Sequence, residues 1–308
     1  MNPVVTVMGG LVVAGVVALG ITTAYVRRHP LETFVKLTRR GMRNAGFARK
    51  TLTLPNGARI VYFEGGRGAR TVVLVHGVND QAGTWVSVAG PLAKEFRVIA
   101  IDLPGHGDSG PATGPLPMKL LTEALTAVID RHPQPRITLV GNSMGGWVSM
   151  LYAADHPSRV EHLVLEDSSG MTWDLSDVPM FPKNREEALR LMRMVHGPQA
   201  KIADAMLDSI VRLALTRPQA RVLEGGIIGS VVDGRLASLT MPVTLIWGAH
   251  DGILPRAYAE ALHARIPGAT LQIVEEAAHI PHRQAPVEFL RVLRESLRAS
   301  AGAEAERR

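Results

Sequence analysis

The chain has 308 residues, of which 46% are apolar and none is cysteine. That length and composition allow a substantial buried core, while the absence of cysteine excludes disulfides, a thiolate nucleophile and thiolate metal sites. The net charge of +6 is concentrated between Arg27 and Lys50, where eight basic residues accompany a single acid. The rest of the chain is nearly neutral, so no nucleic-acid partner is indicated.

The N-terminal segment, residues 1–27, is predicted to be a transmembrane anchor. Residues 3–26 carry no charge and are long enough to cross the roughly 30 Å hydrocarbon layer as a helix. A cleaved signal peptide would carry its positive charge before the apolar run, whereas Arg27 and Arg28 follow it, and the sequence there is a poor cleavage site. Basic residues prefer the cytoplasmic side, so we expect a single-pass membrane protein whose domain after the basic residues lies in the cytoplasm.

Residues 28–50 are predicted to form a basic, amphipathic juxtamembrane segment. Basic residues fill the gaps in a series with helical spacing, which consists of Leu31, Phe34, Val35, Leu37, Thr38 and Met42. Such a helix can lie on an anionic bilayer surface, with its apolar stripe among the head groups. It can also pack on the domain that follows, with a solvated basic face, and the pattern leaves both arrangements open.

From residue 51 onward, short β-branched runs alternate with helical stretches. The runs 51–54 and 59–63 flank Asn56-Gly57 and predict an antiparallel hairpin. Six later runs are typical of strands buried on both faces of a largely parallel sheet: 71–75, 97–101, 137–140, 162–165, 243–247 and 270–274. Helices are expected between them at 82–94, 116–131, 144–156, 255–265 and 285–299. The predicted fold class is α/β, with residues 51–169 and 239–299 as its core.

One interval, residues 170–238, interrupts that alternation. It has helical stretches at 185–195 and 201–215, is rich in Met, Arg and Leu, and contains no convincing strand. Because it begins after one strand and ends before the next, we expect a helical cap over the carboxyl edge of the sheet, where open α/β sheets bind ligands. The Ala-rich, charged tail at 300–308 is expected to be disordered.

A candidate nucleophile, Ser143, lies in the sequence Gly-Asn-Ser-Met-Gly-Gly at 141–146, between a predicted strand and a predicted helix. A serine on such a tight turn exposes its hydroxyl, and the glycines two residues before and after it remove side chains that would clash. The backbone N–H groups of Met144 and Val78 are expected to form the oxyanion hole.

His279 and Asp251 are the candidate base and acid. A serine hydroxyl needs a base to take its proton, and the base needs a third group that fixes its tautomer. His279 follows the last predicted strand and Asp251 follows the strand before it, so both should reach the sheet edge that carries Ser143. Asp167 is the rival acid because it follows an earlier strand. We favour Asp251 for its Gly-Ala-His-Asp-Gly context.

Five motifs make the chain resemble the α/β-hydrolase superfamily over about residues 51–299. They are His-Gly at 76–77, Asp-Leu-Pro-Gly-His-Gly-Asp-Ser at 102–109, the serine motif, Gly-Ala-His-Asp at 248–251 and Ala-Ala-His at 277–279. Within the superfamily the chain is similar to capped lipases and esterases, including monoacylglycerol-lipase-like members with an N-terminal anchor. It also resembles the meta-cleavage-product C–C hydrolases. Those enzymes generally carry a glycine-rich loop after His-Gly, whereas this chain has Val-Asn-Asp-Gln at 78–81.

The resemblance implies a serine hydrolase that cleaves carboxylic esters through an acyl-enzyme intermediate, without a metal or organic cofactor. A serine at position 143 argues against the aspartate-nucleophile chemistry of haloalkane dehalogenases and epoxide hydrolases. The membrane setting and the Met- and Leu-rich cap favour an apolar ester as substrate and membrane lipid as a partner. A C–C bond hydrolase and a non-catalytic scaffold are the alternatives.

The remaining polar residues of these motifs are expected to have structural roles. His76 and His106 should bind backbone groups or line the floor of the pocket, and Asp102 and Asp108 should fix their loop. His282 follows the candidate base closely, but no acid or cysteine cluster accompanies it, so we expect it at the surface rather than at a metal.

Overall fold

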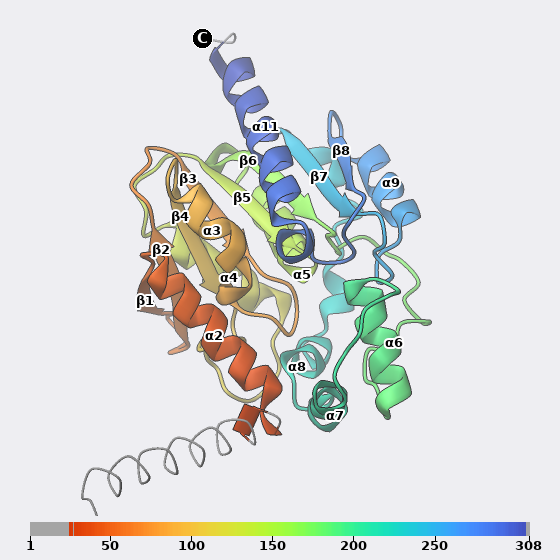
Figure 1. The fold of residues 1–308 in the computed structure, drawn as a ribbon. Helices are drawn as coiled ribbons and strands as arrows, with labels where there is room; N and C mark the ends of the chain where they lie inside the picture. Colours follow the sequence, from red (N-terminus) through yellow and green to blue (C-terminus); the bar gives the residue numbers. More distant parts are fainter. Residues whose placement is uncertain (1–24, 27, 306–308) are drawn as a thin grey trace, which may run out of the picture.

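The computed structural model describes residues 25, 26 and 28–305 (Figure 1). In this part of the chain eight strands form one sheet, in the order β1-β2-β4-β3-β5-β6-β7-β8. β2 is antiparallel to both of its neighbours, and all other pairs are parallel. The strands are β1 (Ala48–Thr53), β2 (Arg59–Gly65), β3 (Thr71–Val75), β4 (Arg97–Asp102), β5 (Ile137–Asn142), β6 (Val160–Glu166), β7 (Val243–Gly248) and β8 (Thr270–Val274). The predicted α/β class with a mostly parallel sheet is confirmed.

Helices cover both faces of this sheet (Figure 1). One face carries α3 (Val86–Leu92) and α11 (Pro286–Ala305), and the other carries α4 (Met118–Ile129), α5 (Met144–Asp155) and α9 (Arg256–Arg265). In β3, Val73 and Val75 belong to one core, while Val72 and Leu74 belong to the other. Successive strand side chains point to opposite faces, so burial of both faces explains why the strand sequences are almost continuously apolar.

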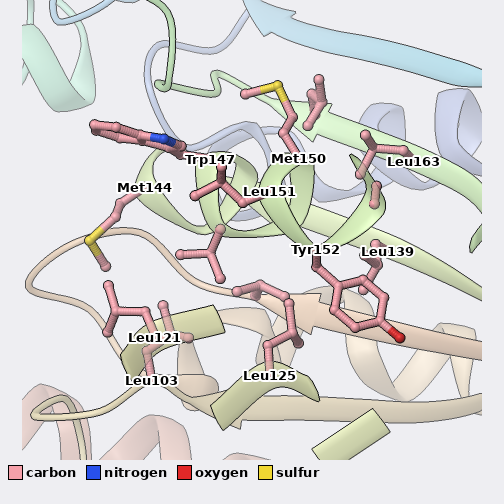
Figure 2. Close-up of a cluster of buried hydrophobic side chains, with 14 of the residues drawn as sticks. Leu103, Leu121, Leu125, Leu139, Met144, Trp147, Met150, Leu151, Tyr152 and Leu163 are labelled. Carbon is pink, nitrogen blue, oxygen red and sulfur yellow. The ribbon is translucent and has the colours of Figure 1, made fainter. Parts of the chain in front are cut away.

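Helix α5 is embedded in the larger of the two cores (Figure 2). Its residues are buried from Met144 to Ala153, and Figure 2 shows its side chains against α4, β5 and β6. A helix that is apolar on all sides is held from every direction. The residue immediately before it, Ser143, therefore has a rigid support on its C-terminal side.

Between β6 and β7 the described chain forms helices and no strand. This interval contains α6 (Arg185–His196), α7 (Asp204–Leu213) and α8 (Pro218–Glu224), followed by the 3-10 turns η3 (Ile227–Ser230) and η4 (Leu236–Ser238). Figure 1 shows the three helices gathered at one end of the sheet. Ala188 of α6 and Leu207 and Ile210 of α7 form a small separate core. Leu31, from the N-terminal part of the described chain, packs against this core.

The basic segment forms helix α2 (Pro30–Asn44), which packs on α7, α3 and the 3-10 turn η1 (Ala82–Trp85). Met42 is fully buried, and the buried Arg39 forms ion pairs with Asp102 and Asp108. Asp102 also accepts the N–H groups of Ala82 (2.7 Å) and Asp108 (3.0 Å), so its expected role in fixing the loop is confirmed. Of the two arrangements left open for this helix, packing on the catalytic domain is observed.

Several segment boundaries differ from the sequence-based expectations. β1 begins at Ala48, so the sheet starts inside the segment 28–50. The helix expected at 82–94 is divided into η1 and α3. At the other end α11 continues to Ala305, where disorder was expected from residue 300; the alanines of this stretch favour a helix.

The predicted transmembrane anchor at 1–27 lies outside the described residues, apart from Tyr25 and Val26. Within the portion that the structure describes, none of the helices combines the length and the hydropathy that a bilayer-spanning helix requires.

Candidate active site

Ser143 occupies a strained turn between β5 and α5. Its φ of 52° and ψ of −122° lie outside the regions that residues with a side chain favour. A Cβ on Gly141 would lie 2.5 Å from the Gly145 oxygen, and one on Gly145 would lie 2.2 Å from the Val75 oxygen. The turn therefore requires both glycines. Ser143 is also tied to β6, because its N–H donates to the Glu166 carbonyl oxygen at 3.0 Å.

The structure brings His279 and Asp251 together, with Nδ1 of His279 lying 2.8 Å from Oδ2 of Asp251. Asp251 follows β7 and His279 follows β8, so two adjacent parallel strands deliver the pair to the sheet edge that carries Ser143. The second carboxylate oxygen of Asp251 accepts the N–H groups of Ile253 (2.8 Å) and Leu254 (3.0 Å). The carboxylate is thereby fixed, and the bond at Nδ1 leaves Nε2 of His279 available to take a proton.

Hydrogen bonds from the last turn of α6 hold both of these loops. The His279 N–H donates to the Val195 oxygen (3.1 Å), and the Gly252 N–H donates to the Met194 oxygen (3.0 Å). A helix leaves its final carbonyls without intrahelical partners, so these oxygens are free to accept. The Asn142 amide donates to the His279 oxygen at 3.0 Å. The sequence does not reveal these supports, apart from the position of Asn142 inside the serine motif.

Asp167, the rival acid, lies next to this pair. It is fully buried, and its Oδ1 accepts the Gly248 N–H at 3.0 Å. Burial raises the pKa of Asp167 well above its usual range, and the neighbouring carboxylates of Asp251 and Glu166 add to the rise. The imidazole of His279 is bonded to Asp251, which is the carboxylate that the sequence favours.

Asp167, Asp251 and His279 are also the residues here that could approach a cation, since one ligand atom from each lies within 4.8 Å of the others. The oxygens of Asp251 are already engaged, because they accept three hydrogen bonds within the described chain. Because these hydrogen bonds occupy its oxygens, Asp251 is better suited to orienting His279 than to binding a metal ion.

The two expected oxyanion donors flank the nucleophile. Met144 begins α5, and Val78 follows Gly77 in the loop after β3. Among the described residues neither N–H donates a hydrogen bond to another protein group. A Cβ on Gly77 would lie 2.9 Å from Asn142 Oδ1 and 3.1 Å from the Ser143 Cβ, so this loop passes directly beside the serine. Two uncommitted backbone donors in this position are what an oxyanion hole requires.

Comparison with known proteins assigns the family. The family described as alpha/beta hydrolase fold matches residues 70–193. An uncharacterised protein of Mycobacterium tuberculosis is 31% identical over 254 residues, which cover 72% of this chain and 73% of that protein. A pimeloyl-[acyl-carrier protein] methyl ester esterase of Serratia marcescens is 32% identical over 247 residues, which cover 74% of this chain and 94% of that enzyme. The chain belongs to the alpha/beta hydrolase family.

Among solved structures, this alpha/beta hydrolase is similar to a membrane phospholipase A described as a bacterial virulence factor. The TM-score is 0.74 at 25% sequence identity, and the match covers 95% of this chain and 99% of that one. The resemblance drawn from the five sequence motifs is confirmed, and the protein is a hydrolase.

A cavity of about 1050 Å³ in this alpha/beta hydrolase is lined by Ser143, His279 and Val78. Its volume lies at the upper end of the range for small-molecule sites. Helices α2, α6 and α7 and the loops beside them supply most of its apolar lining, which includes Leu31, Phe34, Val35, Met180, Leu191, Met192, Val195, Ile202, Met206, Ile210 and Leu213. Helix α2 is thus one wall of the cavity, a role that sequence analysis did not assign to it.

Two histidines of the alpha/beta hydrolase bind backbone groups, as expected. His76 Nδ1 lies 2.7 Å from the Gly77 oxygen, and its Nε2 accepts the Leu103 N–H at 3.0 Å. His106 Nδ1 lies 2.9 Å from the Pro104 oxygen. Burial lowers the pKa of both imidazoles, which fits neutral side chains that hold the loops after β3 and β4.

His282 was expected at the surface, and that prediction is wrong. Its side chain is completely buried, with Nδ1 lying 2.8 Å from a Glu166 carboxylate oxygen and Nε2 lying 2.9 Å from the Thr84 hydroxyl. The short helix α10 (Pro281–Gln284) begins immediately after the loop of His279 and turns this ring inward. There it stacks on Trp85 at a centroid distance of 4.1 Å.

Proposed function

We propose that this hydrolase cleaves carboxylic esters through an acyl-enzyme intermediate, with Ser143 as nucleophile, His279 as general base and Asp251 as the acid that orients the base. The observation that carries the proposal is the 2.8 Å hydrogen bond between His279 and Asp251, beside a cavity that Ser143 and His279 both line. The methyl ester esterase among its relatives supports the same reaction class.

The first half of the reaction transfers the acyl group to the enzyme. The Ser143 hydroxyl oxygen attacks the ester carbonyl carbon while Nε2 of His279 takes the serine proton, and Asp251 stabilises the resulting imidazolium. The N–H groups of Met144 and Val78 donate to the developing oxyanion, and loss of one such donor typically slows turnover about 100-fold or more. The imidazolium then protonates the departing alkoxide, and the alcohol leaves.

The second half releases the acid. His279 takes a proton from water, the hydroxide attacks the acyl carbonyl carbon, and the same oxyanion donors stabilise the tetrahedral intermediate. The proton returns to Ser143 as the carbon–oxygen bond to the serine breaks. The net reaction consumes one water and yields an alcohol and a carboxylic acid.

The proposed substrate is an ester with an apolar acyl chain. The cavity walls from α2, α6 and α7 are mainly aliphatic and Met side chains. Each methylene buried there contributes about 0.8 kcal/mol to binding. The similarity to a membrane phospholipase A further supports an acyl ester of this kind.

We propose in addition that residues 1–27 attach the enzyme to a membrane, with the catalytic domain in the cytoplasm. On α2, Lys36, Arg40 and Arg43 are exposed and available to anionic head groups. Because α2 also lines the cavity, a membrane that contacts this helix would lie close to the route by which an ester enters.

Labelling with a fluorophosphonate probe tests the class of chemistry. The wild-type enzyme should be labelled, and Ser143→Ala should not be; a buried serine of the same helix region, Ser149, supplies the matched control Ser149→Ala, which should still be labelled. A panel of p-nitrophenyl esters of increasing acyl length then tests the substrate. Labelling without turnover of any ester would refute ester hydrolysis, and labelling of Ser143→Ala would refute the choice of nucleophile.

A further inference from the structure

Two buried carboxylates lie side by side next to the His279 ring. Asp251 is 6% exposed and Asp167 is fully buried. One carboxylate oxygen from each and a ring nitrogen of His279 all lie within 4.8 Å of one another. Asp167 directly follows β6, with a positive φ of 40°. The proposed reaction uses Asp251 alone, so the second carboxylate has no role in it.

The hydrogen-bond donors around the two carboxylates are unequal. Asp251 accepts three hydrogen bonds, two from backbone N–H groups and one from His279. Asp167 accepts one, from the Gly248 N–H to its Oδ1. Its buried Oδ2 has no donor among the described residues. A bare buried carboxylate oxygen is costly, whereas a protonated oxygen can itself donate to the acceptor beside it.

Four groups face Asp167: Asp251 after β7, Glu166 at the end of β6, the His279 imidazole after β8, and the Gly248 N–H. The two carboxylates among them disfavour a second negative charge. Burial has the largest effect on the pKa of Asp167 and raises it, the two carboxylates raise it further, and only the Gly248 N–H opposes them. Two carboxylates this close together in a buried site do not both ionise, and the one with fewer donors keeps the proton.

We propose that Asp167 is a neutral carboxylic acid in the resting enzyme and donates a hydrogen bond from Oδ2 to the carboxylate of Asp251. Asp167 is then a positioning residue, because it acts on His279 only through Asp251. It gives Asp251 a further donor, in addition to the backbone N–H groups of Ile253 and Leu254.

The neutral form also suits the chemistry of the proposed triad. The proposed reaction requires an imidazole at His279 that becomes an imidazolium when it takes the Ser143 proton. A second ionised carboxylate would stabilise the imidazolium in the resting state, which would remove the base from the reaction. The Asp167 proton stays on Oδ2 throughout, so the proton balance of the two half-reactions is unchanged.

Infrared difference spectroscopy on the intact enzyme tests the protonation state without any substrate. The wild-type spectrum at neutral pH should contain the C=O stretch of a protonated carboxylic acid, and Asp167→Asn should lack it. Asp155→Asn, an exposed position whose carboxylate pairs with Arg235, is the control and should retain the band. A wild-type spectrum without the band, or a band that survives in Asp167→Asn, would overturn the proposal. Because the readout needs no turnover, it can fail independently of the proposed ester hydrolysis.

Kinetics of two variants test the positioning role. Asp167→Ala removes both hydrogen bonds and should lower kcat about 10- to 100-fold, the effect typical of losing the hydrogen-bond partner of a metal-ligating side chain, which acts in the same indirect way. Asp167→Asn keeps an acceptor for the Gly248 N–H and a donor for Asp251, so it should recover most of that loss. At low pH, kcat/KM of Asp167→Asn should fall over the same pH range as kcat/KM of the wild type. If Asp167 were ionised, removing its charge would shift this range by about one pH unit or more and leave Asp167→Asn as slow as Asp167→Ala.

Discussion

Replacing Arg39 by Met should weaken the docking of helix α2 on the catalytic domain. Arg39 is 6% exposed, and its guanidinium forms ion pairs with the fully buried Asp102 and with Asp108 and donates to Gln81 Oε1 at 3.0 Å. Methionine preserves much of the apolar stem but leaves Asp102 without its counter-charge. Removing one partner of a buried ion pair costs about 3–5 kcal/mol. Asp102 keeps the N–H donors of Ala82 and Asp108, so we expect about 3 kcal/mol, the lower end of that range.

Urea unfolding measures this loss as a fall in the transition midpoint at constant m-value. The matched control is Arg40→Met, because Arg40 is exposed on the same helix and its replacement should change stability by about 0.5 kcal/mol or less. Combining Arg39→Met with Asp102→Asn should restore part of the stability, since the uncompensated charge is then gone. Equal midpoints for Arg39→Met and Arg40→Met would refute the view that this ion pair docks α2.

Asp251→Asn should leave the fold intact and lower kcat by about four orders of magnitude, because the amide favours the wrong tautomer of His279; a milder effect than that of Asp167→Asn would show that the wrong carboxylate was chosen. Deletion of residues 1–29 should release a soluble enzyme that is active on a short ester, since α2 begins at Pro30 and is packed on the catalytic domain. A truncated chain that fails to fold would instead assign the deleted segment to the core. Neutralising the exposed basic residues of α2, or raising the salt concentration, should slow hydrolysis of long-chain esters in anionic vesicles and spare a short soluble ester. An equal effect on both esters would contradict a role in membrane binding; the residues to change are Lys36, Arg40 and Arg43.

The parts of the site that sequence predicts best are those that local geometry dictates. The turn at Ser143 leaves no space for side chains at positions 141 and 145, and the glycines there are visible in the sequence. His279 and Asp251 could be placed because each follows an apolar run, and parallel strands end at the same edge of a sheet. The strand sequences themselves are readable because burial on both faces makes them continuously apolar.

Long-range contacts account for what the sequence analysis missed. His282 is buried by Glu166 and Thr84, which lie far from it in the chain, and no local pattern reveals such partners. In the sequence Arg39 is indistinguishable from the neighbouring basic residues of α2, which are exposed to solvent. It is buried in an ion pair only because the fold brings Asp102 next to it. The face of α2 that turns to the protein contains the half-buried Phe34 and Val35 and the buried Met42, as the apolar spacing predicts, but that spacing does not say what the face contacts.

The bonds from Met194 and Val195 to the loops of Asp251 and His279 have a consequence for protein engineering. A chimera that exchanges the whole interval between β6 and β7 with that of a relative would also exchange the acceptor of the His279 N–H, and catalysis could collapse for reasons unrelated to substrate fit. Exchange of α7 and α8 alone, with a junction placed after residue 197, would change the cavity wall proposed to bind the acyl chain while keeping that acceptor in place. Much of the cavity wall and the support of the His279 loop thus lie in separable stretches of the same insertion.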